Sequence, residues 1–203
     1  MMMNTKEYNA RILCVAIPEA LVLAAKSTMH TAEVEYMSGG KDVATTLSEQ
    51  YYDLVIMDSE NKNIFIKNQS GKKGIPVPVL NAKELSDDRF VSEIEKTIVS
   101  GLLPDWSFFE ATFPDDPKML PLLKLEMKKE FLYFEDSILI AFKTKDSRMM
   151  HKAIHRVETV CEQLRLYAFL RLFYFLRQTN NFDEVISLEA RTRQLVKVIM
   201  SDL

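Results

Sequence analysis

The chain has 203 residues, enough for one large or two small domains that each bury a core. Its hydrophobic fraction of 47% and charged fraction of 27% are ordinary for a globular protein, and its formal net charge of -3 gives no reason to expect a nucleic acid as partner. Cys14 and Cys161 lie in apolar runs without metal-ligand spacing, so we expect two reduced core cysteines.

Nothing in the sequence predicts a role at a membrane. Residues 1–10 lack the continuous apolar region of a signal peptide. No later stretch has the uninterrupted apolar length that a membrane-spanning helix needs. We therefore predict a cytoplasmic protein.

Up to residue 100, short apolar runs typical of strands alternate with runs of helical period. The predicted strands are residues 11–17, 32–37, 54–57 and 77–80, and the predicted helices are residues 18–29, 41–50 and 89–99. Residues 12–15 and 54–57 contain no polar side chain, so both strands should be buried on both faces of a sheet. The alternation predicts an α/β domain over residues 1–100 with a doubly wound parallel sheet.

After residue 100 the strand pattern disappears and every segment has helical period. The predicted helices are residues 106–113, 117–142, 147–164, 167–178 and 182–200. Their connections are short and polar, so neighbouring helices should be antiparallel. Residues 101–203 are therefore predicted to form an up-and-down four-helix bundle, with Arg171 and Arg177 on ordinary solvent-facing surfaces.

One helical segment of this second half holds a histidine beside an apolar stripe. The stripe, with spacings of four and three, consists of Met150, Ile154, Val157, Cys161 and Leu164. His155 follows Ile154 by one position, which rotates it by about a quarter turn into solvent. An imidazole held on a rigid helix can act as a nucleophile toward an activated phosphoryl group. The alternative is a surface histidine without chemistry.

The second half is similar to histidine phosphotransfer domains, the four-helix bundles that carry phosphoryl groups between receiver domains. The match follows residues 104–203 in order and length, from Phe108-Phe109 through Ala153-Ile154-His155-Arg156-Val157 to Phe182-Asp183-Glu184-Val185. The resemblance implies that His155 is the phosphoacceptor. The residues expected to border the face on which a partner docks are Arg148, His151, Arg156, Glu158 and Thr159.

Two residues of this face depart from the family's pattern. Three residues after the histidine the family commonly has a basic residue, followed by glycine, whereas this chain has Glu158 and Thr159. Glu158 shares a helix face with His155, so its carboxylate would lie beside a phosphoryl group. At an exposed site such a like charge costs only about 0.2 to 1 kcal/mol, which weakens transfer without forbidding it. Thr159 adds bulk where a receiver would approach.

The first half resembles the receiver domain of two-component response regulators. Residues 52–58 look like the family's third strand, which ends on the aspartate that accepts a phosphoryl group, here Asp58. Receivers bind magnesium through an acidic pair after the first strand, but Ala16 and Ile17 occupy those positions. Asn81 replaces the family's switch hydroxyl, and residues 83–88 are too few for its fourth helix and fifth strand. We therefore expect a degenerate receiver-like domain with a truncated sheet, in which Asp58 is a vestigial acceptor position.

Together the resemblances imply a two-component phosphorelay protein, a carrier and not an enzyme. His155 would take a phosphoryl group from a partner receiver's aspartate, with no cofactor of its own and with magnesium supplied by the partner. The alternative is a phosphorylation-independent adaptor or inhibitor that binds a histidine kinase or receiver through the bundle. Two further alternatives are homodimerisation through the receiver-like half and a metal clamped by His151, His155 and Glu158.

Overall fold

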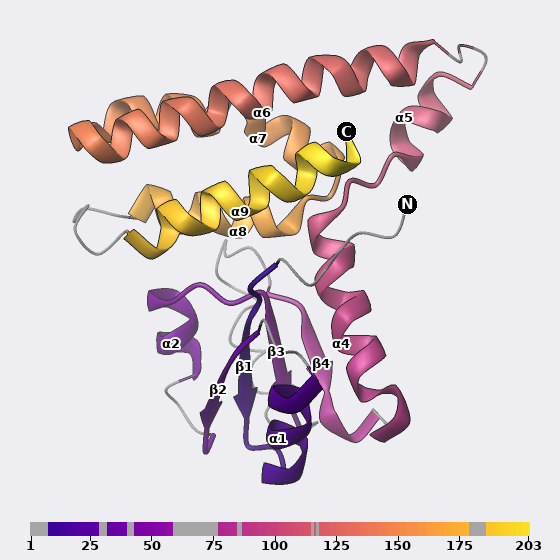
Figure 1. The fold of residues 1–203 in the computed structure, drawn as a ribbon, viewed down its shortest axis with the longest axis vertical. Helices are drawn as coiled ribbons and strands as arrows, with labels where there is room; N and C mark the ends of the chain where they lie inside the picture. Colours follow the sequence, from indigo (N-terminus) through magenta and orange to yellow (C-terminus); the bar gives the residue numbers. More distant parts are fainter. Residues whose placement is uncertain are drawn as a thin grey trace. The chain divides into compact units, whose positions relative to one another are not determined.

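The computed structural model describes residues 8–28, 32–39, 43–58, 77–84, 87–114, 116, 118–178 and 186–203. The chain divides into two compact units, Met1–Ser100 and Gly101–Leu203, and each is described by itself (Figure 1). None of the helices in these ranges is long and apolar enough to cross a membrane.

The first unit contains a parallel four-stranded sheet, in the order β2-β1-β3-β4. The strands are β1 (Arg11–Val15), β2 (Glu33–Met37), β3 (Leu54–Met57) and β4 (Val79–Asn81). The central β1 and β3 are buried on both faces, with every residue of β3 fully buried, as their continuous apolar sequences predict. Among the strands described, β4 lies at an edge and pairs with β3.

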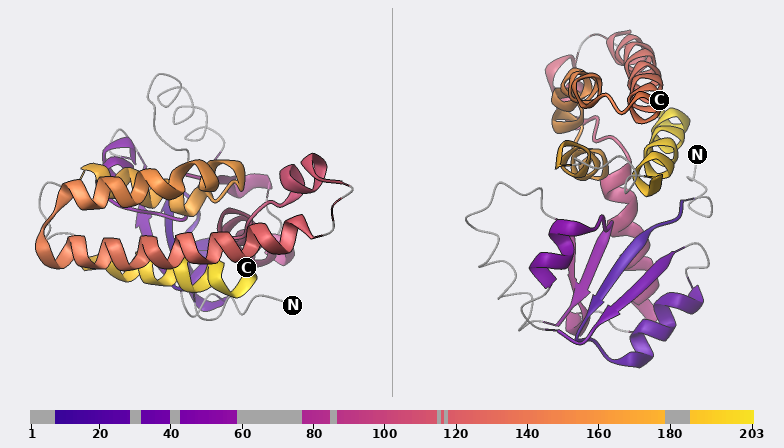
Figure 2. Two further views of the ribbon diagram at one scale, coloured as in Figure 1. Left: turned by 90° about the horizontal axis from the view of Figure 1, so that it is seen from above. Right: turned by 90° about the vertical axis from the view of Figure 1, so that its left-hand side faces the viewer.

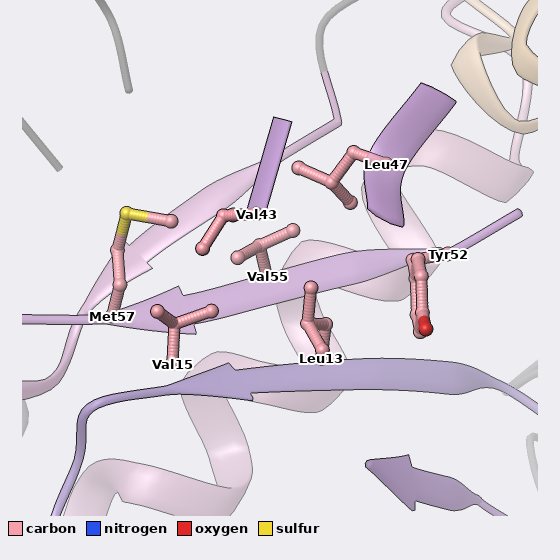
Figure 3. Close-up of a cluster of buried hydrophobic side chains, with 7 residues drawn as sticks. All are labelled: Leu13, Val15, Val43, Leu47, Tyr52, Val55 and Met57. Carbon is pink, nitrogen blue, oxygen red and sulfur yellow. The ribbon is translucent and has the colours of Figure 1, made fainter. Parts of the chain in front are cut away.

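Helices cover both faces of this sheet, which confirms the mixed α/β class (Figure 2). They are α1 (Glu19–Thr28), α2 (Val43–Glu49), the short 3-10 helix η2 (Ala82–Glu84) and α4 (Asp87–Leu102). On one face, two residues of α2 pack against alternate residues of the central strands (Figure 3). This cluster consists of Leu13, Val15, Val43, Leu47, Tyr52, Val55 and Met57. Because successive strand residues point to opposite faces, Ile12, Cys14, Leu54 and Ile56 form the core of the other face.

The ends of three strands differ from the prediction, β2 beginning one residue late at Glu33. β1 stops at Val15, two residues early, because Ala16 adopts a left-handed conformation with φ 51°. Its backbone N–H instead bonds the carbonyl of Met37 at 2.9 Å. β4 begins at Val79 and includes Asn81, which the sequence placed after the strand. The predicted helix over residues 41–50 is present as α2, although its first two positions lie outside the described residues.

A buried carboxyl group joins the segments that precede the two central strands. Asp53, 1% exposed, accepts hydrogen bonds at Oδ1 from the hydroxyls of Tyr8 (2.6 Å) and Tyr51 (2.9 Å). Its Oδ2 accepts a third from the backbone N–H of Arg11 (2.8 Å). These bonds satisfy a polar group in the core and hold residues far apart in the sequence at one end of the sheet.

The second unit is helical. Its helices are α5 (Ser107–Thr112), α6 (Met119–Thr144), α7 (Ser147–Gln163), α8 (Tyr167–Gln178) and α9 (Ile186–Asp202). Helix α7 packs against α6 and α8, and α9 packs against the same two helices, so four helices enclose one core (Figure 2). Only two residues join α6 to α7. Lys145 ends α6 in the left-handed conformation, and the Asp146 side chain caps α7 by accepting a bond from the N–H of Met149 at 2.9 Å.

Aromatic rings from α6 and α8 fill the centre of this unit. Phe131 and Phe134 of α6 contact Phe169 of α8 with ring centroids 5.0 Å and 6.3 Å apart, and Phe134 also meets Phe173 at 5.4 Å. All five apolar positions predicted to face the core are buried, four of them in α7 and the fifth, Leu164, directly after it. The prediction for Arg171 was wrong: this residue is 3% exposed, because every residue of α8 from Ala168 to Phe173 is buried and leaves no solvent-facing side.

Candidate functional site

His155 lies in the middle of α7 and is exposed, whereas the preceding Ile154 is fully buried. Arg148, His151 and Thr159 are also exposed. They precede or follow His155 by seven, four and four residues, spacings that place all four side chains on one face of the helix. The face that the sequence predicts around His155 is therefore open to solvent along α7.

On the side of α7 that faces α6, Arg156 is held in place by two residues. Its Nε and Nη2 both donate hydrogen bonds to the Glu130 carboxylate, the Nη2–Oε1 distance being 2.8 Å. Its guanidinium carbon lies 4.1 Å from the ring centroid of Tyr133. Because Arg156 donates to it, the pKa of Glu130 is below its ordinary value. Arg156 is thus fixed by a charge pair and an aromatic ring instead of extending freely into solvent.

On the side that faces α8, Glu158 is paired with Arg177. Nη1 of Arg177 lies 2.5 Å from Oε1 of Glu158, and Nη2 lies 2.6 Å from Oε2. These hydrogen bonds lower the pKa of Glu158 and raise that of Arg177, although partial burial opposes both shifts. Arg177 is exposed as the sequence predicts, but its side chain is paired instead of free in solvent. The charge of Glu158, which the sequence sets beside His155, is matched by a cation from the next helix.

His155 therefore lies between two fixed charge pairs, Arg156–Glu130 and Glu158–Arg177. Glu130 and Arg177 belong to neighbouring helices and carry no motif that links them to α7, so reasoning from spacing could not identify them. A bidentate arginine–carboxylate pair is geometrically specific and keeps both side chains in one arrangement. The site thus presents an accessible imidazole flanked by two arginine–carboxylate pairs.

The metal alternative for this face has little support in the geometry. Of its three proposed ligands, Glu158 has both carboxylate oxygens bonded to Arg177. In the part of the chain that the structure describes, no group of three or more His, Cys, Asp or Glu side chains could hold a metal ion.

In the first unit, the carboxyl ends of the parallel strands do not supply the donors that a receiver's magnesium needs. Ala16 follows β1, Asp58 follows β3, and Asn81 ends β4. The Asn81 side chain already accepts a bond from the N–H of Lys83 at 3.1 Å, and Glu19 lies in the first turn of α1. A hard divalent cation takes several oxygen ligands, so these residues do not fit a receiver's magnesium site. Residues 59–76, which follow Asp58, lie outside the described part of the chain.

Comparison with known proteins does not identify a relative of this chain. No protein-family model, curated protein or solved structure matches the chain. A functional assignment therefore depends on the chemistry of the residues around His155 and on the resemblance described above.

Proposed function

We propose that the chain is a histidine phosphotransfer carrier of a two-component phosphorelay, with residues 101–203 as the phosphotransfer bundle and residues 1–100 as a degenerate receiver-like domain. His155 accepts a phosphoryl group from the aspartate of a partner receiver and passes it to another. The observation that carries the proposal is the exposed imidazole on α7, set between two fixed charge pairs.

In the transfer step, the ring nitrogen of His155 that holds a lone pair attacks the phosphorus of the partner's aspartyl phosphate. The nitrogen–phosphorus bond forms while the acyl phosphate's phosphorus–oxygen bond breaks, and the electron pair leaves with the partner's carboxylate. The proton on the other ring nitrogen can pass to solvent. Magnesium is supplied by the partner, and the chain itself turns over no substrate.

Arg177 reduces the electrostatic repulsion that a phosphoryl group on His155 would meet. A phosphoryl group on His155 would lie one helical turn from the Glu158 carboxylate, which would repel it. The guanidinium of Arg177 contacts both oxygens of that carboxylate, so the net charge of the pair is close to zero. Repulsion between exposed charges costs only about 0.2 to 1 kcal/mol, and the bound cation reduces it further.

The direct test is incubation of the full chain with a phosphorylated receiver that carries labelled phosphate. Label should appear on this chain, stable to base and labile to acid as a nitrogen–phosphorus bond is, and peptide mapping should locate it on His155 and not on His151. His155→Gln should take no label while its circular dichroism spectrum stays unchanged, because an exposed side chain contributes little to folding.

The second candidate is an adaptor that binds a kinase or receiver without phosphorylation. Thr159 favours it, because this exposed side chain adds bulk one helical turn from His155, where the family commonly has glycine. If no receiver from the same cell labels the chain while His155→Gln binds its partner with unchanged affinity, the carrier proposal fails and the adaptor remains.

A further inference from the structure

The outward face of α6 is unusually apolar. Of the nine large hydrophobic side chains that are exposed in the described part of the chain, five lie on this one helix. They are Leu122, Leu125, Leu132, Tyr133 and Ile140. Single exposed leucines are common on protein surfaces, but a contiguous apolar stripe marks an interaction site.

These residues follow the helical repeat and form one stripe along α6. Leu122, Leu125, Leu132 and Ile140 fall on the side opposite the core positions Met127, Phe131, Phe134 and Ile138. Lys129, Asp136 and Lys143 also lie on this side of α6, and all three are exposed. The name α6 seam stands for Leu122, Leu125, Lys129, Leu132, Tyr133, Asp136 and Ile140. Figure 2 shows α6 along the outside of the helical unit.

We propose that the α6 seam binds the α6 seam of a second copy of this chain, antiparallel, about a two-fold axis between Leu132 and Tyr133. In this register Leu125 lies opposite Ile140 of the second copy, and Leu132 lies opposite Tyr133 of the second copy. Lys129 faces Asp136 of the second copy. The two-fold axis repeats each contact, so the interface contains two such ion pairs and a continuous apolar centre.

The two charges select this arrangement over its competitors. A parallel pairing would set Lys129 against Lys129 and Asp136 against Asp136. Sliding the antiparallel pair by one helical turn in either direction would place Asp136 opposite Leu125 or Tyr133. Lys129 now bonds Glu126 of its own helix at 2.6 Å, but both side chains are more than half exposed and such a pair exchanges partners at little cost.

The predicted dimer is weak and depends on concentration. A stable protein–protein interface buries about 800 Å² on each partner, and the seam of a single helix offers less. The α6 seam includes no residue of α7, although its Tyr133 also lies against Arg156, which follows His155. The proposal does not rest on phosphoryl transfer.

Sedimentation velocity of the full chain at increasing concentration tests the proposal. The wild type should shift from monomer to dimer, and Leu132→Glu should remain a monomer throughout. The matched control is Leu23→Glu, because Leu23 of α1 is 57% exposed, outside α6. This control should dimerise like the wild type. Both variants should keep their helical circular dichroism, since neither replaced side chain is buried.

Charge exchange tests the register. Lys129→Asp alone and Asp136→Lys alone each place like charges opposite one another, so each variant should be monomeric. An equimolar mixture of the two should form a heterodimer, because every facing pair is then complementary. The double variant Lys129→Asp with Asp136→Lys should regain the wild-type shift.

Cross-linking locates the contact. Leu125→Cys and Ile140→Cys should form an intermolecular disulfide only when the two variants are mixed, since the native Cys14 and Cys161 are fully buried. A wild type that stays monomeric at every concentration would overturn the proposal. A dimer abolished by Leu23→Glu but not by Leu132→Glu would also overturn it, since the interface would then lie in the first unit. Failure of the mixture to associate, or disulfide formation by either cysteine variant alone, would reject the antiparallel register.

Discussion

Both terminal nitrogens of Arg177 in α8 donate hydrogen bonds to the carboxylate of Glu158 in α7, which lies 19 residues earlier in the sequence. The planar guanidinium matches the two carboxylate oxygens in a way that a lysine ammonium could not. Because Glu158 shares a helix face with His155, the pair controls the charge that any group on the imidazole would meet.

Replacing Arg177 and replacing Glu158 should change the equilibrium fraction of phosphorylated His155 in opposite directions. Arg177→Gln leaves the Glu158 charge uncompensated, so the fraction of phosphorylated His155 at equilibrium should fall. Glu158→Gln leaves a free cation, so that fraction should rise. Each change should be a few-fold, corresponding to about 0.2 to 1 kcal/mol. Labelling with a phosphorylated receiver measures both.

The double variant Glu158→Gln with Arg177→Gln should return close to the wild-type value. Arg193→Gln is the control, because Arg193 pairs with Glu189 within α9 and not with α7. If the two single variants shift the phosphorylated fraction in the same direction, the charge explanation is wrong.

The same pair should make stability depend on pH in the acid range. The folded pKa of Glu158 lies below its ordinary value of 4.5, so the pair contributes stability that is fully present above that value. This contribution is lost as the pH falls below 4.5 through the folded pKa. Urea unfolding of the wild type and of Arg177→Gln should therefore differ near neutrality, by up to about 1 kcal/mol, and converge in acid. A difference that persists unchanged in acid would contradict this assignment.

Removing the buried Asp53 carboxyl should strongly destabilise the first unit. Asp53→Ala leaves the Tyr8 and Tyr51 hydroxyls and the Arg11 N–H without their acceptor, at a cost of about 1 to 3 kcal/mol for each buried group that stays unsatisfied. Tyr8→Phe should cost less, because the other two donors remain. Tyr36→Phe, at a half-exposed position, should be near neutral in the same denaturation experiment.

Asp58 should not behave as a phosphoacceptor. Because Ala16 and Ile17 stand where the family has its acidic pair, we expect neither acetyl phosphate nor beryllium fluoride with magnesium to modify Asp58. Mass spectrometry should find no adduct there, whereas a receiver with an intact acidic pair gains one under the same conditions. An acid-stable, base-labile phosphoryl group on Asp58 would show that other residues complete the site.

The bounds of β3 and α8 were predictable from the sequence. The four apolar residues of β3 lie between Asp53 and Asp58, and the predicted and observed bounds agree. Helix α8 also begins and ends at the predicted residues. The end of β1 was missed because Ala16 carries none of the glycine or asparagine signal that usually accompanies a left-handed residue.

The candidate site was predictable only along a single helix. The position of His155 beside a buried stripe follows from helical spacing, and its exposure agrees with that reasoning. The contacts of Glu158 and Arg156 depend on which helices are neighbours and on how each helix is rotated about its axis. The hydrophobic periodicity of a single helix predicts neither. Arg171 shows the same limit, since a charged residue within the continuously buried stretch from Ala168 to Phe173 cannot be distinguished locally from one at the surface.

The bonds to Asp53 also bear on the order in which the chain folds. Tyr8 and Arg11 reach an acceptor 45 and 42 residues further along, so these contacts form only after a large loop has closed. In the second unit, α6 and α7 meet across two connecting residues and nucleate locally. Since local topologies fold faster than parallel sheets, the helical unit should be complete while the sheet is still assembling, and refolding should show two kinetic phases.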